Sequence, residues 1–322
     1  MQFRTQVKPL DKQGLIDHSQ RVLMIGSCFT ENIGSRLTSS LFNVSVNPFG
    51  PLYNPLSIAR SIDLLASQKV YTPDDTFCAE GLWHCYDFHS RFSSAHQSHA
   101  LELMNRSIEA YQPPQVLILT LGSDAAFINK ATGEVVANCH KQPQSHFELV
   151  HCSISTMRDA LTGCIDKLRQ VSPSLQVIFT VSPVRHLSYG ASTNSRAKGR
   201  LIEAAMSIAD DDPKVSYFHA YEIMMDDLRD YRFYATDMIH PSEIAVDYIF
   251  ELFSQSYFTP TTQKLADECE ALTRRLRHRP MSDNVANHQK FMDSTLQLAK
   301  SMMKKHPQLI PSIENLIHTH AL

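Results

Sequence analysis

The chain has 322 residues and a net charge of −3, with 43% hydrophobic and 20% charged residues. This length suits two domains, or one large α/β domain with an appendage, and the apolar fraction allows a sizeable core. The charge argues against a nucleic-acid binder, which usually carries a clustered basic excess. No segment approaches the ~18 uncharged apolar residues of a membrane helix, and the first 14 residues lack the apolar run of a signal peptide.

Seven cysteines are scattered along the chain with no C-x-x-C pair, which favours free thiols in a reducing compartment over a disulfide framework. We therefore expect a cytoplasmic protein. No H-E-x-x-H motif or paired cysteine spacing indicates a metal site, and we expect no cofactor.

Five short apolar runs bounded by turn residues predict strands buried on both faces, and hence a parallel sheet. They cover residues 21–27, 43–47, 116–123, 175–184 and 215–220. The strands should end within a few residues of Ser27, Asn47, Ser123, Val184 and Ala220.

Amphipathic stretches between these runs predict helices at residues 30–41, 55–67, 147–168, 195–210 and 241–255. Alternating strands and helices predict a doubly wound α/β fold. Residues 71–112 have no regular pattern. We expect one α/β domain over residues 1–256 and, over 257–322, a helical extension packed on the core, with helices at 263–279 and 287–305 separated by His278-Arg279-Pro280 and a third after Pro311.

The segment Gly26-Ser27-Cys28-Phe29 follows the first predicted strand and opens a helix. A nucleophile there would lie near backbone N–H groups and the positive helix end, which lower the pKa of a thiol and stabilise an oxyanion. The alternative is a tight turn in which Ser27 caps the helix and Cys28 packs inward.

The segment from Asp237 to Pro241 follows the last predicted strand. An Asp three residues before a His can reach its Nδ1 in a tight loop, which leaves Nε2 of His240 free to act as a base. Pro241 suits the first position of the following helix. The alternative is an ordinary Asp cap beside a surface histidine.

Three loops carry candidate oxyanion donors or substrate-binding residues. Gly50 follows the second strand and is the leading donor, Ser123 follows the third strand, and Asn138 and His140 lie on a later loop. Turn chemistry alone also explains Gly, Asn and Pro at such places.

These segments resemble the SGNH/GDSL hydrolases, which place G-D-S-L at the first strand end and D-x-x-H before the last helix. The chain is most similar to the GSCFA-domain type, named for the segment seen here as Gly26-Ser27-Cys28-Phe29-Thr30. The resemblance implies a three-layer α/β/α sandwich with a five-stranded parallel sheet. In the ungapped match Cys28 takes the nucleophile position, Ser27 replaces the family Asp, and Asp124 falls where an oxyanion Asn belongs.

The leading hypothesis is an acyl esterase or acyltransferase acting on a small acylated substrate, with carbohydrates as one candidate class. Cys28 or Ser27 would attack, with Cys28 favoured, while His240 accepts the proton and Asp237 orients it. A catalytically inactive binding module on the same fold is the alternative, and a metal-dependent hydrolase using His84, His89 and His140 is a third.

Overall fold

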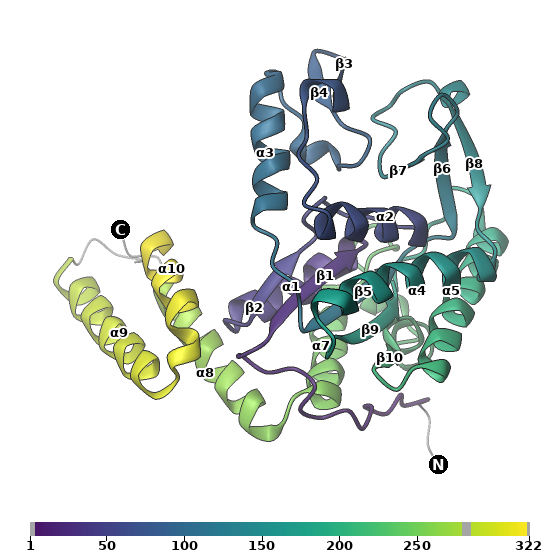
Figure 1. The fold of residues 1–322 in the computed structure, drawn as a ribbon. Coiled ribbons are helices and arrows are strands. Elements are labelled where there is room, and N and C mark those ends of the chain that lie inside the picture. The colour runs from purple at the N-terminus through teal and green to yellow at the C-terminus, as the bar shows by residue number, and fades with distance from the viewer. Residues whose placement is uncertain (1–3, 279–284, 321–322) are drawn as a thin grey trace.

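The computed structural model describes residues 4–278 and 285–320. Its centre is a five-stranded sheet in the order β10-β9-β5-β1-β2, in which every pair of neighbours is parallel (Figure 1). The strands are β1 (Arg21–Gly26), β2 (Asn43–Val46), β5 (Val116–Leu121), β9 (Gln176–Val181) and β10 (Val215–Phe218). The prediction of a parallel sheet with these five strand ends is confirmed.

Helices cover both faces of the sheet because successive residues of each strand point to opposite sides. Leu23 and Ile25 join a core beneath α2 (Pro55–Ala66), α4 (Ile154–Val171) and α5 (Ala191–Asp211). Val22 and Met24 join a second core beneath α1 (Cys28–Ser39) and α7 (Glu243–Tyr257). The molecule is therefore the predicted three-layer α/β/α sandwich.

Two small antiparallel sheets lie above the carboxyl ends of the central strands (Figure 1). One is the hairpin β3 (Phe77–Ala79) and β4 (Leu82–His84), and the other has the order β7-β6-β8. The strands of the second are β6 (Ala125–Asn129), β7 (Val135–Val136) and β8 (Phe147–His151).

Two sequence predictions fail in this region. The sequence predicts a helix over residues 147–168, but Phe147 and Val150 belong to β8. The helix begins at Ile154 because Ser153 caps it. The sequence predicts no regular structure over residues 71–112, yet they contain β3, β4 and α3 (Gln97–Glu109).

The last part of the chain is helical, as predicted, with α8 (Pro260–Leu276), α9 (Val285–Lys305) and α10 (Ile310–His320). Figure 1 shows α9 and α10 to one side of the sheet, beyond β2. Cys269, Leu272 and Ile313 pack together with Leu41, which follows α1. Of the predicted break between α8 and α9, Arg279 and Pro280 lie outside the described residues. Within the described part of the chain, no helix is long and apolar enough to cross a membrane.

Candidate active site

Cys28 is the first residue of α1, directly beyond the end of β1. Ser27 is the N-cap, and its Oγ accepts a hydrogen bond from the Phe29 N–H at 3.3 Å. This satisfies one of the backbone donors that a helix start leaves free. Ser27 is buried, whereas the Cys28 side chain is partly exposed at the carboxyl edge of the sheet.

Gly26 allows this turn because β1 and β5 approach very closely there. A Cβ on Gly26 would lie 2.3 Å from the Thr120 carbonyl oxygen. The Gly26 N–H donates to Asn47 Oδ1 at 2.9 Å, so the end of β2 also anchors the turn.

Asp237 organises the loop that carries His240. Its Oδ1 accepts from the backbone N–H groups of Ile239 and His240, each at 2.9 Å. The Ala235 N–H donates to the His240 carbonyl, and Met238 adopts a left-handed φ of 57°. Helix α7 begins at Glu243 with Ser242 as its cap, so the prediction that Pro241 is the first helical residue is wrong.

The two loops meet at one edge of the sheet and align three side chains. Cys28 Sγ lies 3.5 Å from His240 Nε2, and His240 Nδ1 lies 2.6 Å from Asp237 Oδ2. Each imidazole nitrogen thus has one partner. Cys28 has the position of a nucleophile, His240 that of a base, and Asp237 that of the carboxylate that orients the base. Among the described residues, the Ser27 hydroxyl has no hydrogen bond to His240; its oxygen serves the helix cap.

Two pKa shifts set the charges of this arrangement. Burial raises the pKa of the Cys28 thiol, and the nearby Phe29 N–H offsets this only in part. The expected net lowering by the helix end is therefore wrong, because desolvation outweighs it. Hydrogen bonds from the His240 and Ile239 N–H groups lower the pKa of Asp237 to about 2, so this carboxylate is ionised at neutral pH.

Lys198 is a buried cation near the site that the sequence analysis missed. Its Nζ donates to the carbonyl oxygens of Gly122 at 2.9 Å and Ser182 at 2.8 Å, so it ties together the ends of β5 and β9. Burial lowers the pKa of Lys198 to about 7. The charge of Lys198 also favours the thiolate of Cys28.

A cavity of about 520 Å³ opens over Cys28 and His240. Its walls come from the loop before α2, from β6 and β7, and from the loop after β9. Ser123, a predicted substrate-binding residue, lies in this lining. Its hydroxyl accepts from the Ala125 N–H.

Three other predicted binding residues do not line the cavity. The Gly50 N–H donates to the Asn47 carbonyl, so its proposed role as an oxyanion donor has no support in this geometry. Asn138 Oδ1 accepts from the His140 N–H, and His140 Nε2 lies 2.8 Å from the Cys85 carbonyl oxygen. Both residues hold a loop in place.

The histidines proposed as metal ligands have other partners. His84 Nδ1 lies 2.7 Å from Ser93 Oγ, and the His89 ring accepts from the Arg91 N–H. Over residues 4–278 and 285–320, no group of three or more His, Cys, Asp or Glu side chains is placed to hold a metal ion.

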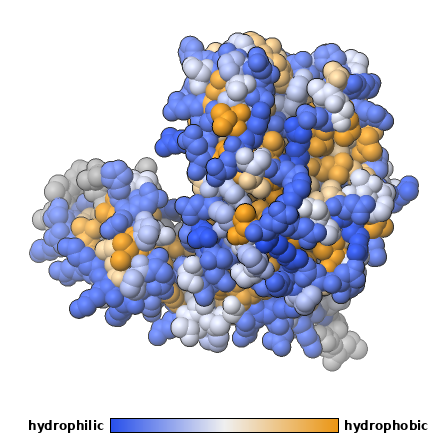
Figure 2. Space-filling view, in the orientation of Figure 1, coloured by the Kyte–Doolittle hydropathy of each residue, from blue (hydrophilic) through white to orange (hydrophobic). Residues whose placement is uncertain are grey.

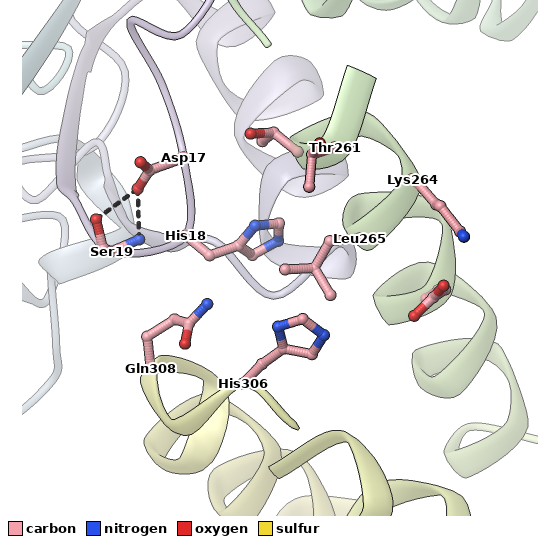
Figure 3. A pocket seen from close by; sticks show the side chains of 10 residues that line it. Asp17, His18, Ser19, Thr261, Lys264, Leu265, His306 and Gln308 are labelled. Atoms are coloured by element: carbon pink, nitrogen blue, oxygen red, sulfur yellow. Dashed lines mark hydrogen bonds between the residues drawn. The ribbon is translucent and has the colours of Figure 1, made fainter. Parts of the chain in front are cut away.

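A second cavity, of about 400 Å³, lies where the segment before β1 meets α8 and the segment after α9 (Figure 3). Its residues include Asp17, His18, Lys264 and His306. The His18 ring stacks on Phe42 at 3.9 Å, and its Nε2 lies 2.9 Å from the Ser40 carbonyl oxygen. This histidine therefore joins the end of α1 to the N-terminal segment.

The GSCFA family model matches residues 21–253, which include all three aligned side chains, and the C-terminal domain of GSCFA domain proteins matches residues 269–318. The chain belongs to the GSCFA family. No curated protein matches it.

Solved structures resemble this GSCFA protein only distantly. A carbohydrate esterase family 3 protein from Talaromyces cellulolyticus is 12% identical, with 77% of this chain and 98% of that chain covered and a TM-score of 0.35. An acetyl xylan esterase from Butyrivibrio proteoclasticus is 11% identical, with coverages of 78% and 64% and a TM-score of 0.37. TM-scores this low support no inference about activity.

In this GSCFA protein Asp124 is buried and ion-paired. Its Oδ2 accepts from Arg200 Nε at 2.7 Å, and Oδ1 lies 3.1 Å from His151 Nδ1. An ionised carboxylate cannot donate a hydrogen bond. In addition, Asp124 does not line the cavity over Cys28. An oxyanion donor would have to come from elsewhere.

Proposed function

We propose that this protein moves acyl groups through Cys28, as an esterase or acyltransferase of the SGNH type acting on a small acylated substrate. The observation that carries the proposal is the line of side chains from Cys28 Sγ through His240 to Asp237, at 3.5 and 2.6 Å. It opens into a cavity within the size range of small-molecule sites.

The first step would transfer the Cys28 proton to His240 Nε2 as the sulfur attacks the acyl carbon. Because burial keeps the thiol protonated, His240 has to act as a general base at the moment of attack. Asp237 would stabilise the imidazolium through Nδ1 without taking its proton.

The second step would expel the leaving alcohol or thiol, which takes the proton from His240, and leave a thioester on Cys28. Water or an acceptor hydroxyl would then release the acyl group by the reverse path. The Cys28 N–H, at the start of α1, has no backbone acceptor among the described residues and is our candidate oxyanion donor.

Ligand binding without turnover is the second candidate, favoured by the ion-paired Asp124 at the position of the family's oxyanion Asn. Turnover of a short-chain ester distinguishes the two functions. A binding module would hold acylated ligands but release no product.

The test is acyl trapping with an activated ester, followed by peptide mapping of the labelled protein. We expect the acyl group on Cys28, and we expect Cys28→Ala to lose both label and turnover. Cys139→Ala is the matched control, since this cysteine is also partly exposed but lies outside the cavity. Label and turnover that persist in Cys28→Ala and disappear in Ser27→Ala would make Ser27 the nucleophile instead.

A further inference from the structure

One wall of the cavity over Cys28 is an apolar face of the small sheet. Ala125 and Phe127 alternate along β6 with Ala126, which is buried in the core. They therefore point to the opposite side, toward the cavity that they line. Phe127 is paired with Val136 of β7, and because paired residues share a face, Val136 extends the same wall.

Other parts of the lining carry large apolar side chains that are exposed to solvent. Leu187 and Tyr189, on the loop after β9, are 42% and 40% exposed, and Tyr53, before α2, is 44% exposed. All three line this one cavity. Exposed apolar side chains gathered around a concave site mark a place where an apolar group binds.

Figure 2 shows hydrophobic surface below β7 and beside β6, on the face of the molecule turned to the viewer. The residues of the β6 and β7 wall line the same cavity as Cys28, which lies at the carboxyl ends of the central strands. A chain attached to an acyl carbon at Cys28 would run between β6 and the loop after β9.

We propose that the acyl group is an aliphatic chain longer than acetyl, held in this cavity by the apolar side chains of Phe127, Val136, Leu187 and Tyr189. This inference rests on the proposed acyl transfer through Cys28 and adds the class of acyl group. The polar line from Cys28 to Asp237 would hold the reacting carbonyl, and the apolar walls would hold the chain.

The experiment measures kcat/KM for nitrophenyl esters with acyl chains of two, four, six, eight and ten carbons. Each buried methylene should raise kcat/KM about threefold to fourfold until the cavity is full. Ala125→Leu, which puts a larger side chain into the cavity wall, should lower kcat/KM for the long-chain esters more than for the acetyl ester, and so remove most of this rise. Ala131→Leu is the matched control, because Ala131 is exposed on the turn between β6 and β7.

The outcomes separate this inference from the proposed function. A kcat/KM that is highest for the acetyl ester and falls with chain length would overturn the long-chain acyl group, while acyl transfer itself would stand. A chain-length rise that Ala125→Leu and Ala131→Leu change equally would place the chain elsewhere and also overturn the inference. No turnover of any ester, together with no acyl label on Cys28, would contradict the proposed function.

Discussion

Cys28 and Ser27 are neighbours in the chain, but their side chains have different partners. The Ser27 oxygen caps α1, while the Cys28 sulfur faces His240 Nε2. The sequence alone left both residues open as nucleophiles because each is compatible with a turn that starts a helix. The distinction needs the three-dimensional placement of His240, which lies 212 residues further along the chain.

Replacing Asp237 with Asn should lower kcat/KM by about two to four orders of magnitude. The amide would no longer stabilise the imidazolium, and it could not accept from the loop N–H groups and from Nδ1 as the carboxylate does. Asp230→Asn is the control, since Asp230 accepts from the Arg232 N–H in the preceding segment and does not contact His240. Equal activity of the two variants would remove Asp237 from the mechanism.

The pKa of Asp237, about 2, also bears on the pH profile that we expect for the proposed activity. A lowered carboxyl pKa means that the ionised form persists as the pH falls and is lost only near that pKa. Any loss of activity above about pH 4 therefore belongs to another group.

The roles of four other residues could not be predicted from the sequence. Lys198 lies in a stretch predicted as an amphipathic helix, where a lysine is usually solvated, and only the packing of α5 on β5 and β9 buries it. Gly50, Asn138 and His140 have the residue types of functional turns. In the structure their hydrogen bonds hold the turns themselves.

At the scale of elements, the central strands were predictable because both of their faces are buried, which leaves nearly continuous apolar runs in the sequence. The small sheet was not, because its short strands have one face toward the cavity. Phe147 and Val150 also have the three-residue spacing of a helix, so they extended the pattern of α4 backwards. Ser153, which accepts from the Thr156 N–H, is the cap signal that marks the true start.

The close approach of β1 and β5 predicts that Gly26→Ala destabilises the protein by several kcal/mol. The new Cβ would meet the Thr120 backbone at 2.3 Å, and backbone cannot move aside as a flexible side chain can. Gly163→Ala is the control: it lies within α4 with open space around it and should stabilise by up to about 1 kcal/mol. Urea unfolding measures both, and a Gly26→Ala protein as stable as wild type would contradict the close packing.

At the scale of the whole molecule, the sheet brings residues from opposite ends of the domain to one edge. Parallel strands all end at that edge, and α1 and α7 pack in one core on the same face of the sheet, so the loops before these two helices meet there. This is the position where open α/β sheets bind ligands. The sequence predicted this convergence because the two motifs follow the first and last strands, but it could not predict the shape of the cavity, which depends on β6 and β7.

Acid should destabilise the whole fold through its buried histidines. Burial lowers the pKa of His140 to about 4, and burial likewise lowers the pKa of His18. An unfolded chain takes up the proton near pH 6.5, before the folded one does. Above about pH 6.5 His140 is neutral in both states and does not change the free energy of unfolding. As the pH drops from about 6.5 toward 4, the unfolded chain binds the proton more readily than the folded one, and the free energy of unfolding falls by up to about 3 kcal/mol.

The test compares the free energy of unfolding at pH 7.5 and pH 4.5 in wild type and His140→Asn. Asparagine tolerates the left-handed backbone found at position 140, where φ is 48°, and does not titrate. We expect the variant to be less stable than wild type at pH 7.5, because the contact with Cys85 is lost, yet to lose less stability on acidification. His146→Asn, at an exposed histidine, should keep the wild-type pH dependence. If His140→Asn and His146→Asn respond to acid alike, the acid sensitivity of the fold does not come from the buried His140.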